Sequence, residues 1–83
     1  MLLPLTANQQ QAFRAFYALF RRNKYPPTNK EVHAAVGRPV DNEIAVLIKK
    51  GWLERIPGLG ARNRKPTAEA EQEARAADQY PLF

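Results

Sequence analysis

The sequence predicts a mainly α-helical domain that carries a small β-hairpin. Three stretches place apolar residues at helical spacing, and capping motifs precede the first two. Two short strand-like runs then flank a turn rich in Pro and Gly, which is typical of a hairpin. At 83 residues the chain has room for one small domain with a thin hydrophobic core.

The first helix is expected over residues 7–23. Thr6 and Gln9 fit a capping box, in which each side chain accepts a hydrogen bond from the other residue's backbone N–H. Four aromatic side chains follow on one helical face and are expected in the core: Phe13, Phe16, Tyr17 and Phe20.

The second helix is expected over residues 29–36. Tyr25-Pro26-Pro27 must be extended, because proline disfavours a helical residue before it. Thr28 and Glu31 then fit a second capping box, and Gly37 suits the left-handed conformation that ends a helix. The residues expected to be buried are Val32, Ala35 and Val36.

The third helix is expected over residues 42–50, after a short turn at Arg38-Pro39-Val40. Asp41 is the expected cap, and Gly51 ends the helix. The buried face is expected to carry Ile44, Leu47 and Ile48. At about 100° per residue, the opposite face carries Asn42, Val46 and Lys49.

The hairpin is expected to pair a strand at residues 52–56 with a basic return strand at residues 61–65. The turn at residues 57–60 has two glycines able to adopt a positive φ, and Pro66 ends the return strand. The domain is therefore expected to span residues 1–66.

Residues 67–83 form a separate segment rich in Ala and Glu, expected to be either a helix or a frayed tail. The charge changes sign at the same place. Residues 1–66 carry 12 of the 13 Lys and Arg but 4 of the 8 Asp and Glu, a net charge of +8, whereas the remainder is −3. A basic body with an acidic appendage is typical of nucleic-acid-binding proteins.

Several function classes are disfavoured by composition. The chain has no Cys and no Ser, and its single histidine, His33, cannot build a catalytic triad or a His-rich metal site. We therefore expect no enzyme activity, no metal and no cofactor. The start MLLPLT lacks the features of a secretion signal, and no apolar run approaches a membrane span. The expected location is the cytoplasm, with no membrane partner.

Three helices followed by a basic hairpin is the order of a winged helix-turn-helix. In that fold the third helix is presented to the major groove of DNA, and the hairpin, or wing, reaches the backbone or the minor groove. The element order therefore predicts double-stranded DNA as the partner.

Short motifs in the same order resemble the N-terminal DNA-binding domain of LexA-type repressors, which is a winged helix-turn-helix. The similar motifs are Leu5-Thr6 with Gln9-Gln10, Tyr25-Pro26-Pro27-Thr28 with Glu31, Gly37, and Lys50-Gly51-Trp52-Leu53-Glu54. The resemblance covers residues 5–66 and implies a sequence-specific transcriptional regulator of bacterial or phage origin.

The chain departs from that family in three respects. The stretch from Gly37 to Gly51 is about one helical turn shorter than in the family, and its third helix begins with the acidic residues Asp41 and Glu43. The autocleavage domain of full-length LexA-type repressors is absent from the 83 residues, so self-cleavage is not expected.

The predicted DNA contacts lie on four parts of the chain. Asn42 would pair with adenine, Val46 would touch a thymine methyl, and Lys49 would meet guanine or phosphate. Phosphate contacts are expected from the start of the second helix, the following turn and the wing: Thr28, Asn29, Lys30, Arg38, Arg62, Asn63, Arg64 and Lys65.

Two alternatives remain open at this point. The acidic start of the third helix also fits a small phage- or plasmid-type protein that uses the same fold to bind transcription machinery or a repressor. The acidic C-terminal segment could mask the basic face, pair two copies as a homodimer, or be disordered.

Overall fold

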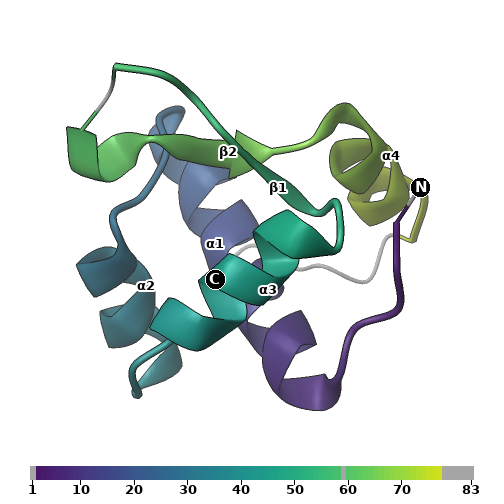
Figure 1. The fold of residues 1–83 in the computed structure, drawn as a ribbon, viewed down its shortest axis with the longest axis horizontal. Helices are drawn as coiled ribbons and strands as arrows, with labels where there is room; N and C mark the ends of the chain where they lie inside the picture. Colours follow the sequence, from purple (N-terminus) through teal and green to yellow (C-terminus); the bar gives the residue numbers. More distant parts are fainter. Residues whose placement is uncertain (1, 59, 78–83) are drawn as a thin grey trace.

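The fold is a cluster of helices closed on one side by a two-stranded hairpin, as the sequence predicts (Figure 1). The computed structural model describes residues 2–58 and 60–77, so the predictions for residues 78–83 lie outside the described residues. Its elements in chain order are α1 (Ala7–Asn23), α2 (Asn29–Val36), α3 (Asp41–Lys49), β1 (Leu53–Arg55), the 3-10 turn η1 (Gly60–Arg62), β2 (Arg64–Pro66) and α4 (Ala68–Ala77).

The two predicted capping boxes are present and fix the starts of α1 and α2. The Thr6 hydroxyl accepts from the backbone N–H of Gln9 at 3.3 Å, and the Gln9 side chain accepts from the backbone N–H of Thr6 at 3.0 Å. Thr28 and Glu31 repeat this exchange at 3.2 and 2.8 Å. Gly37 ends α2 in the left-handed conformation, with φ of 89°.

The predicted span of α3 is wrong by one residue at each end. The cap position is Val40, no side chain caps the helix, and Asp41 is its first residue. Asp41 does not act as a cap because its carboxylate accepts a hydrogen bond from Asn29 on α2 instead. Lys50 is the final cap position, and Gly51 follows with φ of 89°.

The predicted return strand is wrong over residues 61–63. The antiparallel register pairs Leu53 with Pro66 and Arg55 with Arg64, so Pro66 is the last residue of β2, where an edge position tolerates its missing N–H. Residues 60–62 form η1, because the Arg62 side chain is held against α2 rather than in a ladder.

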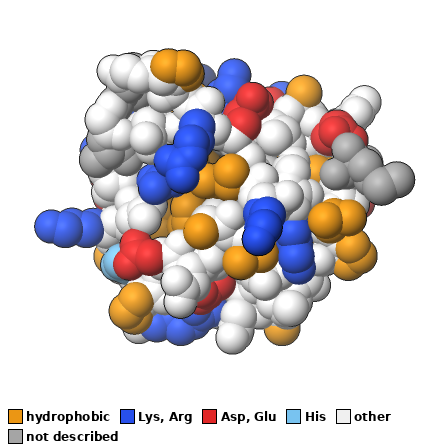
Figure 2. Space-filling view, viewed as in Figure 1, with side chains coloured by type: hydrophobic (Ala, Val, Ile, Leu, Met, Phe, Trp, Pro, Cys, Tyr) orange, Lys and Arg blue, Asp and Glu red, His pale blue; other side chains and the backbone are white. Residues whose placement is uncertain are grey.

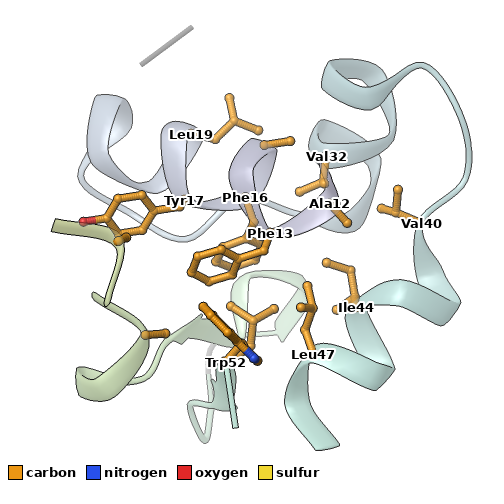
Figure 3. Packing of buried hydrophobic residues seen from close by; sticks show 14 residues of the cluster. Ala12, Phe13, Phe16, Tyr17, Leu19, Val32, Val40, Ile44, Leu47 and Trp52 are labelled. Atoms are coloured by element: carbon orange, nitrogen blue, oxygen red, sulfur yellow. The ribbon is translucent and has the colours of Figure 1, made fainter. Parts of the chain in front are cut away.

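The core is built on the aromatic face of α1 (Figure 3). Phe13 and Phe16 are at most 1% exposed, and Trp52 meets the Phe13 ring edge-on at 5.0 Å. Phe20 is only partly buried. The predicted burial of Ala35 is wrong, because Ala35 lines an open hollow between α2 and the start of α1.

Two terminal segments extend this core. Leu3 in the N-terminal segment donates its N–H to the carbonyl of Lys50 at 3.1 Å and accepts from the Trp52 indole N–H at 2.7 Å. At the other end, α4 is a docked helix rather than a frayed tail over residues 68–77. Its Ala70 and Ala74 are at most 3% exposed and belong to the core cluster.

We expect Phe13→Ala to lower the free energy of unfolding by about 3–5 kcal/mol, because it leaves a large cavity in a thin core. The matched variant Leu3→Ala should cost less than about 1 kcal/mol, since the Leu3 side chain is 47% exposed. Urea unfolding followed by far-UV circular dichroism measures both, and equal losses would contradict this picture of the core.

Candidate nucleic-acid interface

The predicted contacts come mainly from three neighbouring elements. In the view of Figures 1 and 2, α3 lies in front, α2 beside it and the hairpin above it. Figure 2 shows blue Lys and Arg side chains on this face around a central group of orange apolar side chains. The face thus combines cations with apolar side chains; cations can contact DNA phosphates, and apolar side chains can contact thymine methyl groups.

The outer side of α3 matches the prediction. Asn42 and Lys49 are exposed and Val46 is half-buried, whereas Ile44 and Leu47 are at most 1% exposed on the inner side. The helix is therefore anchored by its aliphatic residues and presents its polar residues to solvent.

A hollow of about 450 Å³ separates the start of α2 from the hairpin. It brings together five of the predicted contact residues and one glycine of η1: Thr28, Asn29, Lys30, Gly60, Asn63 and Arg64. Residues more than thirty positions apart in the sequence thus share one concave surface.

A chain of hydrogen bonds links the three elements. Arg64 on β2 donates to the Asn29 side-chain oxygen at 3.0 Å, and the Asn29 amide donates to Asp41 at 2.8 Å. His33 Nε2 lies 3.3 Å from the same Asp41 oxygen, without hydrogen-bond geometry. Asn29 therefore joins β2 to the first turn of α3.

Arg62 is held by α2 and by the loop before it. It donates to both carboxylate oxygens of Glu31, at 2.8 and 3.3 Å, and to the carbonyl of Pro26 at 2.9 Å. Its guanidinium also lies over the Tyr25 ring, 4.6 Å from the centroid. The structure thus shows Arg62 holding the hairpin in place.

This ion pair shifts both partners in the expected directions. The Arg62 hydrogen bonds, with that from the backbone of Thr28, lower the pKa of the Glu31 carboxyl. Glu31 in turn raises the pKa of Arg62. On the neighbouring strand, burial and the nearby charge of Arg55 lower the pKa of Arg64.

Arg38 lies at the turn before α3, against the start of α1. It pairs with Glu43 at 2.6 Å and also donates to the Gln11 side chain at 3.0 Å and the Asn8 carbonyl at 3.4 Å. The first turn of α3 contains two acidic residues, and each contacts another side chain of the chain. Glu43 pairs with Arg38, and Asp41 accepts a hydrogen bond from Asn29.

Two exposed residues of this face were missed by the sequence predictions. Ala45 is exposed on α3, three residues after Asn42, and that helical spacing was the available signal. Arg55 is exposed on β1 and lies opposite Arg64 in the hairpin register. The sequence offers little indication that Arg55 is exposed, because apolar and polar residues barely alternate around it.

Within residues 2–58 and 60–77, no group of three His, Asp or Glu side chains is placed to hold a metal ion. Over the same residues, no helix has the length and apolar character needed to cross a membrane.

We expect acid to weaken the fold through Glu31. Because Glu31 has a lowered pKa in the folded chain, its pair with Arg62 stabilises the fold fully above the ordinary value of 4.5, and this contribution disappears as the pH falls through the lowered value. Urea midpoints measured from pH 7 to pH 3 should fall less steeply for Glu31→Gln than for the unmodified chain. Glu73→Gln, which changes an exposed carboxylate of α4, is the matched control. Parallel profiles for the Glu31 variant and the unmodified chain would contradict the assignment.

We expect Asn29→Ala to disturb two elements that are distant in sequence. Loss of its two side-chain hydrogen bonds should lower the free energy of unfolding by about 1 kcal/mol and shift the amide resonances of both Asp41 and Arg64. Lys30→Ala, at the exposed neighbouring position, should leave those two resonances in place. Shifts confined to α2 in the Asn29 variant would refute the link.

Comparisons with known proteins agree with this architecture. The family model described as LexA DNA binding domain matches residues 2–62. The LexA repressor of Hahella chejuensis is 26% identical over 91 aligned positions, which cover 99% of this chain and 46% of that protein. The LexA repressor of Cupriavidus necator is 32% identical over 82 positions, covering 94% and 37%, and that of Marinobacter nauticus is 30% identical over 73, covering 83% and 36%.

No solved structure matches the chain. The chain spans less than half the length of the curated relatives it matches. The family model, in contrast, covers most of this chain, from the N-terminal segment through η1. The chain belongs to the LexA DNA-binding domain family.

Proposed function

We propose that the chain binds double-stranded DNA in a sequence-specific way as a transcriptional repressor. The observation that carries this proposal is the shared face of α3, the start of α2 and the hairpin, in a member of the LexA DNA-binding domain family. On this proposal α3 enters the major groove and the basic hairpin lies on the sugar-phosphate backbone.

The contacts divide into base readers and phosphate binders. Asn42 pairs with an adenine, Val46 packs on a thymine methyl, and Lys49 meets a guanine or a phosphate at the end of α3. Phosphates occupy the hollow at the start of α2, where the helix dipole favours an anion and where Thr28 and Lys30 lie beside the backbone N–H groups.

The remaining predicted contacts follow from the bonds already described. From the hairpin, contacts to the sugar-phosphate backbone of DNA come from Asn63, Arg64 and Lys65. Arg62 and Arg38 use several of their N–H donors inside the chain, so they reach phosphate only with the donors left over. Asn29 is likewise shared between a phosphate and its internal partners.

The internal pairing of the acids favours DNA over a protein partner for this face. A protein-binding module was suggested by the acidic start of the third helix. Glu43 is 20% exposed and its charge is paired with that of Arg38, whereas Asp41 accepts a hydrogen bond from the neutral amide of Asn29 and keeps its charge. The exposed cations Lys30, Lys49 and Lys65 outnumber that one carboxylate. The basic side chains of the face therefore set its sign.

We further propose that two copies occupy two half-sites, as helix-turn-helix proteins commonly do. Ala70 and Ala74 of α4 face the core of the chain itself, so pairing through the C-terminal segment uses the outward residues of α4, such as Glu73 and Arg75. A palindromic target is the expected consequence.

The direct test is a titration of fluorescent duplex by anisotropy across a range of salt concentrations. The logarithm of the binding constant should fall linearly with the logarithm of salt, because cations of the chain replace counterions on the phosphates. Lys30→Ala and Lys65→Ala should each reduce that slope by about 1. Arg21→Gln removes an exposed cation of α1 that makes none of the proposed contacts, and it should leave the slope unchanged. Absence of binding to any duplex at low salt would refute the proposed function.

A further inference from the structure

The base-reading part of α3 is unusually apolar. Four side chains lie on its outer side at helical spacing: Asn42, Ala45, Val46 and Lys49. Lys49 is at the C-terminal end, whereas the N-terminal part of a recognition helix approaches the base edges. One amide and two aliphatic side chains are therefore left to meet the bases.

The acidic residues of α3 are already engaged. Asp41 is 63% exposed, but its carboxylate reaches back to α2, where Asn29 donates to it at 2.8 Å and His33 lies 3.3 Å away. Glu43 is 20% exposed and pairs with Arg38 at 2.6 Å. These contacts direct Asp41 toward α2 and Glu43 toward Arg38, whereas a carboxylate that reads cytosine must be directed at the cytosine amino group.

The means of reading guanine are equally limited. The commonest specific contact to guanine comes from an arginine or a lysine. Helix α3, which the structure describes completely, contains no arginine, and its one lysine, Lys49, is its last residue, far from the N-terminal part that approaches the bases. Asparagine, in contrast, matches the two hydrogen-bonding groups of adenine in the major groove, and aliphatic side chains match the thymine methyl.

We propose that α3 reads a half-site of successive A·T pairs, with Ala45 as an additional specificity-determining residue. Asn42 recognises an adenine, and Ala45 and Val46 form one apolar surface for thymine methyls. This inference rests on the proposed function, because it concerns which bases the same face reads. Figure 2 shows apolar side chains at the centre of this face of the molecule, between cationic groups.

The test begins with selection of the full 83-residue chain against random duplexes. The expected result is a consensus with adjacent A·T pairs at its most constrained positions. Replacing one contacted thymine by uracil, which removes only the C5 methyl, should then weaken binding about fourfold in an anisotropy titration. Val46→Ala should reduce the loss of affinity caused by uracil to below about twofold at the thymine that Val46 contacts. The loss at a thymine contacted by Ala45 should stay unchanged.

A second variant keeps the test independent of packing, because Val46 is half-buried and Asn42 is exposed. Asn42→Ala should lower affinity for the selected duplex about tenfold and leave affinity for random duplex unchanged. It should also abolish the penalty for 7-deazaadenine, which lacks the N7 acceptor. Lys30→Ala is the matched control: it should weaken selected and random duplexes alike and retain the uracil penalty.

The possible outcomes distinguish failure of the proposed A·T reading from failure of the proposed DNA binding. Failure to bind any duplex refutes the proposed function, and binding without a consensus refutes its sequence-specific part together with the inference. A consensus of G·C pairs, or selected duplexes that are indifferent to uracil and 7-deazaadenine, would overturn the inference alone and leave sequence-specific DNA binding in place.

Discussion

One carboxylate holds the interface together. Glu31 closes the capping box at the start of α2 and also receives two hydrogen bonds from Arg62. The same side chain therefore fixes where α2 begins and where the hairpin lies relative to it. The hollow at the start of α2 exists because both of its walls are held by this residue and by the link from Arg64 to Asn29.

Three acidic side chains hold basic or polar side chains of the chain in place. The net charge of +5 combines a basic body with acidic residues that have specific tasks. Glu31 and Glu43 hold Arg62 and Arg38, and Asp41 supports Asn29. The acids thus order part of the basic surface, while Lys30, Lys49 and Lys65 lie exposed on it. Such an arrangement favours a fixed pattern of cations over a diffuse positive field.

The helices could be predicted where their limits are encoded by nearby residues. Thr6 with Gln9 and Thr28 with Glu31 act within one turn, and the spans of α1 and α2 agree with the structure. The start of α3 could not be predicted in this way, because the carboxylate of Asp41 bonds to a residue twelve positions earlier. The hairpin itself was predicted, but its return strand is wrong over residues 61–63 for a similar reason, since Arg62 bonds to Glu31, thirty-one positions away.

The same distinction applies to the candidate site. Exposure of Asn42 and Lys49 follows from the period of one helix, so the sequence was sufficient. Arg38, Arg62 and Asn29 make hydrogen bonds to residues that are distant in sequence or on other elements. Nothing in the local sequence distinguishes these three residues from freely exposed polar residues. Ala45 was overlooked because a small apolar residue on a helix surface carries little signal until its neighbours are in place.

The attachment of the N-terminal segment has an optical consequence. The chain has a single tryptophan, and this residue packs edge-on against Phe13 while its indole N–H donates to the carbonyl of Leu3. Its fluorescence therefore reports on two events at once, the closure of the core and the seating of the first few residues. A spectroscopist can follow the seating of that segment without adding a label to the face formed by α2, α3 and the hairpin.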